Sequence, residues 1–145
     1  MKRSVKRLTA LAVALILCIS TATAASARSS YYLSAYRAWL SIGDNGAIGV
    51  VVDVQATTDM DEVGASRIQL FESQDGGESW ETVKIYLKSI FPQMVDTNTY
   101  IYYDIPVTYA GTPGYQYYAI VSMYAGDSTG SDTRHYVTGV VTARQ

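Results

Sequence analysis

Few side chains in this sequence have the chemistry for nucleophilic catalysis. His135 is the only histidine, Cys18 is the only cysteine, and Asp132 precedes the histidine by three residues. A catalytic triad needs a histidine that reaches both a serine and a carboxylate. His135 follows a polar loop at the start of a predicted strand, where a solvated histidine is the simpler interpretation. We therefore predict no catalytic residue, and one histidine also leaves too few nitrogen and sulfur ligands for zinc.

Oxygen ligands for a hard cation are more plentiful. Asp59, Asp61 and Glu62 lie close together after a predicted strand, in a segment that we expect to be a loop. Carboxylates can bind calcium there, although the spacing lacks the glycine and the closing glutamate of an EF-hand. The same residues also suit turns and caps that are exposed to water. We keep them as the candidate calcium set and predict no other metal or cofactor.

Tyrosine is abundant, with thirteen residues in the chain. Alternation along the predicted strands places four of them on the side opposite the expected core: Tyr86, Tyr102, Tyr118 and Tyr124. Amphipathic rings suit both sugar stacking and protein interfaces. These four residues are therefore the candidate ligand-binding set. The alternative is that they pack against each other or cover the sheet.

These side chains depend on strands for their positions, and alternation predicts strands over most of the chain. The segments are 31–41, 47–56, 67–71, 82–87, 100–107, 115–125 and 135–143. We expect the following residues to point inward: Ile48, Val50, Val52, Val54, Val83, Ile85, Leu87, Ile101, Tyr103, Ile105 and Val107. Pro106 cannot donate to a ladder and indicates a sheet edge or the end of a strand.

Seven strand-like segments without a convincing helix predict an all-β domain. Short strands separated by turn residues are typical of an immunoglobulin-like β-sandwich, with about seven antiparallel strands in two sheets. A small barrel is the alternative. The sequence has no repeat of the length that a solenoid or propeller requires.

One turn between two predicted strands has a recognisable pattern of residues. Residues 73–80 read Ser-Gln-Asp-Gly-Gly-Glu-Ser-Trp, which resembles the Asp-box hairpin, Ser-x-Asp-x-Gly-x-Thr-Trp. Ser73 and Asp75 can bond across such a turn, Gly77 permits the tight bend, and Trp80 can pack over it. Asp-boxes are structural in the propellers where they recur. The resemblance therefore implies a stabilising hairpin and no catalytic role.

Two broader resemblances point to the architecture. Residues 111–121, Gly-Thr-Pro-Gly-Tyr-Gln-Tyr-Tyr-Ala-Ile-Val, are similar to the sixth strand of immunoglobulin-like and fibronectin type III domains. That resemblance implies that the hydroxyl of Tyr115 or Tyr117 bonds to backbone at the corner. Residues 60–66 with the turn after them also resemble small secreted bacterial proteins of uncharacterised function. That likeness spans most of residues 45–143 and implies a fold without an activity.

Residues 1–27 read as a secretory signal peptide, with basic residues, an apolar run and the Ala25-Ser26-Ala27 cleavage motif. Cleavage would remove Cys18 and four of the eleven Lys and Arg, leaving one domain at residues 28–145 with a net charge of 7 − 13 = −6. The remaining cations are scattered singly, which argues against nucleic acid as a partner. After cleavage we expect no membrane attachment. The oligomeric state stays open.

Together these features predict a secreted, non-catalytic domain that binds an extracellular protein or a glycan. A carbohydrate-binding module that uses exposed tyrosines is one alternative. A small secreted hydrolase is another, although its acids, such as Asp53, Glu72 and Asp104, are scattered along the chain without the long insertions that build a cleft.

Overall fold

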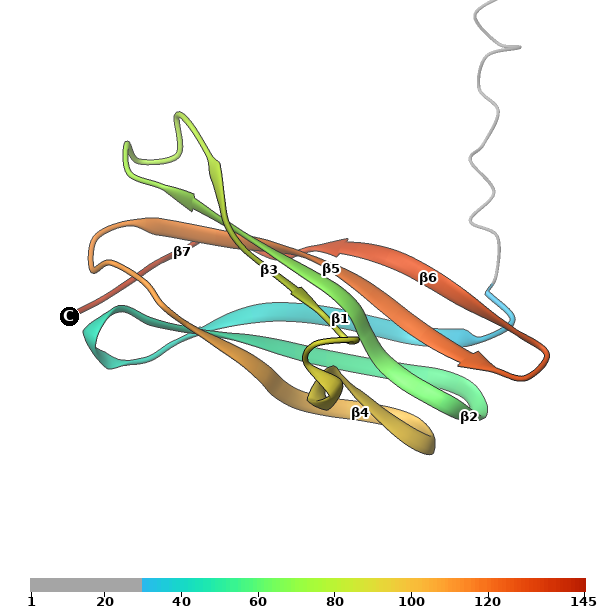
Figure 1. The fold of residues 1–145 in the computed structure, drawn as a ribbon. Helices are drawn as coiled ribbons and strands as arrows, with labels where there is room; N and C mark the ends of the chain where they lie inside the picture. The colour runs from blue at the N-terminus through green and yellow to red at the C-terminus, as the bar shows by residue number, and fades with distance from the viewer. Residues whose placement is uncertain (1–29) are drawn as a thin grey trace, which may run out of the picture.

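A computed structural model describes residues 30–145, so the predicted signal peptide lies outside the described residues. The described part is all-β, as predicted, with seven antiparallel strands and two short 3₁₀ turns (Figure 1). The elements are β1 (Leu33–Ile42), η1 (Asp44–Gly46), β2 (Ala47–Ser73), β3 (Glu81–Leu87), η2 (Pro92–Met94), β4 (Val95–Ala110), β5 (Gln116–Asp127), β6 (Gly130–Val137) and β7 (Val141–Thr142).

The long strand β2 organises the sheet. β1 pairs with residues 48–56 of β2 and β4 with residues 47–64, while β5 pairs with residues 62–73 and β3 with residues 67–72. β6 and β7 pair with β5. Residues 56–59 of β2 lie opposite only Tyr100 of β4, and the strand bends sharply there (Figure 1). Hydrogen bonds therefore join all seven strands in one curled sheet. The division into two separate sheets remains a prediction.

The inward row predicted for residues 47–56 is confirmed. Ile48, Val50, Val52 and Val54 are all buried. They pack with apolar residues from the second part of β2 and from β5, among them Ile68, Leu70, Ala119 and Val121. Burial of these aliphatic side chains is the main source of stability in a chain without disulfides.

The inward row predicted for β4 is wrong over residues 101–105. Tyr102 is 1% exposed, whereas Tyr103 is 63% exposed. The register with β2 changes between the pairs Val50↔Val107 and Val52↔Asp104, so β4 carries one extra residue beside Pro106. A bulge of this kind reverses which side chains face the core. Tyr102 therefore fills the core, and its hydroxyl donates to the Gln93 carbonyl at 2.7 Å.

The orientation predicted for β3 is wrong at Ile85 and Leu87, whereas Val83 is partly buried and packs against the core as predicted. Tyr86 is 5% exposed, while Ile85 and Leu87 are exposed. Tyr86 lies opposite the buried Ile68 of β2 and packs edge-on against Phe91, with ring centroids 5.1 Å apart. The register with β2 changes between the pairs Leu70↔Lys84 and Phe71↔Thr82, so β3 carries one extra residue at Val83. A bulge of this kind changes which side chains face the core, and alternation along β3 did not show it.

The segment predicted as a loop around residues 59–62 is part of β2. Gly64 is needed just beyond it, because a Cβ there would overlap the carbonyl oxygen of Met94. Its φ of 151° also lies in a region that L side chains rarely adopt. The junction between η2 and β4 therefore lies against β2 at close range, where Gly64 pairs with Val95.

The turn between β2 and β3 has the bonds expected of its residues. Ser73 Oγ donates to Asp75 Oδ1 at 2.8 Å and accepts the Gly77 N–H at 2.8 Å. Asp75 also accepts the Ser79 N–H at 2.9 Å. The Ser79 hydroxyl, the Ser79 N–H and the Ser73 hydroxyl together lower the Asp75 pKa to about 2. These bonds fix the hairpin, and membership of the Asp-box class stays a resemblance.

Candidate functional site

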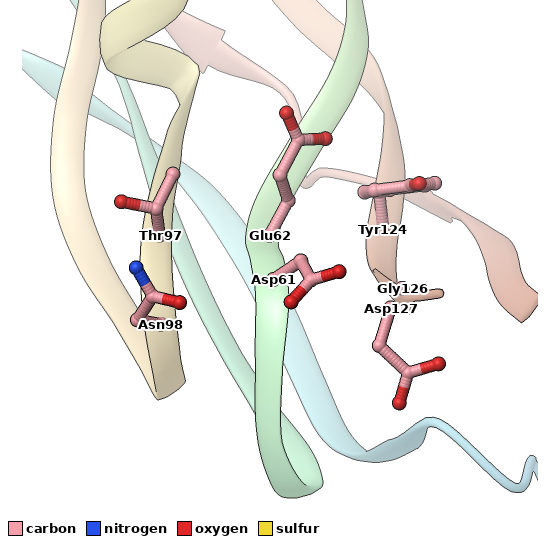
Figure 2. Close-up of a pocket in the computed structure, with 7 residues that line it drawn as sticks. All are labelled: Asp61, Glu62, Thr97, Asn98, Tyr124, Gly126 and Asp127. Atoms are coloured by element: carbon pink, nitrogen blue, oxygen red, sulfur yellow. The ribbon is translucent and has the colours of Figure 1, made fainter. Parts of the chain in front are cut away.

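An open groove of about 550 Å³ crosses three neighbouring strands (Figure 2). It forms where β2 runs between β4 and β5, because Glu62 pairs with both Thr97 and Gly126. The groove is mostly polar. Its lining residues are Asp61, Glu62, Thr97, Asn98, Tyr124, Gly126 and Asp127.

Several groups in the groove already have partners within the chain. Lys88 forms an ion pair with Glu62, and its Nζ lies 4.0 Å from the ring centroid of Tyr124. Asp127 accepts the hydroxyl and N–H of Thr129, which lower its pKa. Lys88 therefore covers one face of the Tyr124 ring, and that face is not open to a ligand.

The candidate calcium residues are only partly brought together. Asp61 and Glu62 line the groove, but Asp59 does not. Within residues 30–145, no group of three or more His, Cys, Asp or Glu side chains is arranged to hold a metal ion. Glu62 is paired with Lys88. The structure therefore gives no support to a calcium site here.

The predicted row of four outward tyrosines does not form. Tyr86 and Tyr102 are buried, which corrects their assignment to the outer surface. Tyr118 is half-buried between Phe71, stacked at 4.6 Å, and Trp80, edge-on at 4.7 Å. This aromatic cluster supports the hairpin after β2. Tyr118 therefore acts in packing, and only Tyr124 lines a groove.

His135 does not meet the acid proposed for it. Its Nδ1 lies 3.0 Å from the hydroxyl of Ser122, directly across the β5–β6 ladder. Asp132 instead pairs with Arg134 at 3.1 Å. The Ser-His-Asp arrangement considered from the sequence is therefore not assembled by these residues.

A second candidate surface lies on the outer face of β1, β2 and β4. The ladder places Arg37, Asp53 and Tyr103 in one row, and Ala35, Gln55 and Ile101 in the next. Residues directly opposite each other in antiparallel strands point to the same face. Trp39 continues the β1 row, and Ile105 continues the β4 row. We call this surface the platform; it comprises Arg37, Trp39, Asp53, Gln55, Ile101, Tyr103 and Ile105.

The platform combines exposed apolar side chains with one ion pair. Tyr103, Ile101 and Ile105 are 63%, 48% and 47% exposed. The Trp39 and Tyr103 ring centroids lie 6.2 Å apart, with the rings tilted by 44°. Arg37 bonds to Asp53 Oδ2 at 2.7 Å and lies over the Trp39 ring, 5.3 Å from its centroid.

A small cleft adjoins the platform at its Ile101 end. It has a volume of about 260 Å³. Arg37, Asp53, Gln55 and Ile101 line it together with Ala35 and Tyr36. Polar groups thus stand beside exposed rings, which is the combination that ligand-binding sites use to orient an apolar surface.

Sequence reasoning missed the platform because it assigned Ile101, Tyr103 and Ile105 to the core. The available signal was Pro106. A proline inside an alternating run is found at an edge or a bulge, and a bulge exchanges the two faces of a strand. Trp39 gave no such signal, because residues 31–41 are apolar on both sides.

Comparisons of the chain with protein families, with curated proteins and with solved structures found no match. Among residues 30–145, no helix has the length and hydrophobicity to cross a membrane.

Proposed function

We propose that this chain is a secreted, non-catalytic domain that works by binding, and that the platform on β1, β2 and β4 is its binding surface. One observation carries this proposal. Three large apolar residues of β4 are about half exposed or more and lie beside a tryptophan and an arginine on one sheet face. Contiguous apolar surface on a small domain typically marks an interaction site.

The composition of the platform also favours binding. Trp, Tyr and Arg are the residue types that contribute most to binding energy in interfaces. On the opposite face of the same stretch of β2, Val50, Val52 and Val54 are buried in the core, so the platform is backed by packed sheet. A rigid support lowers the entropy lost when a ligand binds.

Recognition by pairing with an added β-strand is disfavoured at the free edge of β4. Both polar backbone groups of Ile101 bond to the Thr99 hydroxyl, each at 3.2 Å. The Pro106 carbonyl accepts from the Gln93 side chain at 3.2 Å. These bonds occupy the backbone groups of Ile101 and the Pro106 carbonyl, and this favours recognition through the side chains of the platform.

Arrays of immobilised glycans and extracellular proteins test this function with the labelled protein and a double variant, Ile101→Ser with Tyr103→Ser. We expect every ligand found to bind the variant at least about tenfold more weakly, because hot-spot residues each contribute more than about 1 kcal/mol. The matched control is Ile85→Ser with Leu87→Ser, which removes exposed apolar residues from β3. Binding that survives the platform variant unchanged would contradict the proposal.

The hydrolase alternative predicts turnover. A screen of the same glycans and of ester and peptide substrates measures product release. Turnover that disappears in Asp61→Asn would move the function to the groove of Figure 2 and away from the platform.

A further inference from the structure

We infer that the ligand of the platform is a neutral saccharide, held with a sugar ring in the cleft between Arg37, Asp53, Gln55 and Ile101. The inference rests on the proposed function and names its ligand class. It uses residues that differ from the four tyrosines expected from the sequence.

Unpartnered hydrogen-bonding groups line the cleft. Arg37 bonds to Asp53 through Nε and lies over the Trp39 ring, and within the described residues its two Nη groups have no hydrogen-bond partner. The side-chain amide of Gln55 likewise has no hydrogen-bond partner in the described part of the chain. The guanidinium and the amide thus offer donors, while the Gln55 oxygen and the second oxygen of Asp53 offer acceptors. Vicinal hydroxyls, which both donate and accept, match this set.

The apolar side of the same surface suits the carbon face of a sugar ring. Ile101 forms one wall of the cleft, and Tyr103 and Trp39 extend the apolar area beyond it. Aromatic and aliphatic side chains bury C–H surface, while polar groups at the edge fix its orientation. A pyranose presents both kinds of surface at once.

Charge favours a neutral ligand over an anionic one. The Arg37 guanidinium is paired with the Asp53 carboxylate, with 2.7 Å between Nε and Oδ2. Because the two charges offset each other, the cleft carries no net positive charge that would favour an acidic sugar. The cleft of about 260 Å³ is also smaller than the roughly 300–1,000 Å³ pockets of drug-sized ligands. One ring in the cleft with further units on the platform fits these dimensions.

Affinity electrophoresis and titration calorimetry with the domain of residues 30–145 test the inference. The probes are soluble xylan, mannan and β-1,3-glucan, with polygalacturonate as the acidic comparison. The variants are Gln55→Ala and Arg37→Lys. Their matched controls are Gln69→Ala and Arg67→Lys. Arg67 is exposed and Gln69 is partly exposed on another part of the sheet, with 3.0 Å between Nη2 and Oε1.

We expect at least one neutral polysaccharide to bind, and both platform variants to weaken it about tenfold, because each removes hydrogen bonds to a ligand. The control variants should bind as the parent does. Binding of polygalacturonate alone, or neutral binding unchanged in both platform variants, overturns the inference. Binding of a protein through Ile101 and Tyr103 with no glycan bound also overturns it, yet leaves the proposed function standing.

Discussion

The hydroxyl of Tyr117 donates to Glu72 Oε2 at 2.7 Å. It also accepts the backbone N–H of Thr112 at 2.8 Å, as expected of a tyrosine at this corner, and the Tyr117 side chain is fully buried. Tyr117→Phe would leave both partners without this oxygen and should lower the free energy of unfolding by about 1–3 kcal/mol. Urea unfolding measures the change. Tyr109→Phe is the control, because the Tyr109 ring is adjacent but its hydroxyl has no hydrogen bond in the described structure. An equal loss in both variants would contradict the role of the hydroxyl.

The same tyrosine predicts sensitivity to alkaline pH. Burial and the bond to Glu72 raise the Tyr117 pKa to about 12 from 10, partly offset by the Thr112 N–H. Between those two values the folded state holds a proton that the unfolded chain releases, so stability is lost as pH rises through this range. Burial raises the pKa of Tyr102 and Tyr86 in the same direction. Urea midpoints measured from pH 10 to pH 12 should fall steadily, and less steeply in Tyr117→Phe. Parallel slopes would assign the alkaline loss to other groups.

The lowered pKa of Asp75 predicts that stability is also lost in acid, as pH falls. Its pKa is about 2 in the folded hairpin and 3.8 without these bonds. The contribution of Asp75 to folding stability is therefore complete above pH 3.8 and disappears as pH falls towards 2. Asp75→Asn keeps the shape of the side chain but loses the charge that its donors stabilise. The variant should melt at a lower temperature than the parent at neutral pH, with the gap closing in acid. Calorimetric melts at several pH values measure this gap; one that persists unchanged in acid would contradict it.

Neighbouring tyrosines on β4 give a direct test of the bulge. Tyr102 is 1% exposed and Tyr103 is 63% exposed. Tyr102→Ala should cost about 3–5 kcal/mol, because it removes a large buried side chain. Tyr103→Ala should change stability by less than about 0.5 kcal/mol, as is usual for surface substitutions. Chemical denaturation of both variants decides between this arrangement and its reverse, which simple alternation along residues 100–107 predicts.

Alternation predicted the fold class and the core row of β2, because Ile48, Val50, Val52 and Val54 alternate with mainly small or polar residues. It failed on β3 and β4, because each strand carries one extra residue relative to β2 and such a bulge exchanges the faces of a strand. On β4 the shift follows from the bulge at Pro106, which depends on pairing with β2 and is a tertiary property. The platform was missed for the same reason. The groove of Figure 2 needed residues from β2, β4 and β5 to meet, which spacing along one strand cannot show.

The free edge of β4 gives a final prediction. In the described sheet β4 pairs with β2 alone, so its other side presents backbone groups that a second chain could pair with. The Thr99 hydroxyl forms hydrogen bonds with the backbone of Ile101, and the Gln93 side chain donates to the Pro106 carbonyl, so some of these groups already have partners. Thr99→Val with Gln93→Ala removes both side-chain partners while leaving the apolar platform in place.

We expect this double variant to self-associate more than the parent, since uncovered edges and exposed apolar side chains favour strand pairing. Sedimentation velocity over a concentration series measures the shift to larger species. Thr97→Val is the control, because Thr97 is exposed on the same strand but its side chain makes no hydrogen bond in the described structure. Equal association in the control would attribute the effect to added hydrophobicity and not to the uncovered backbone. A double variant that sediments as the parent does would show that the bend and bulge of the sheet already protect this edge.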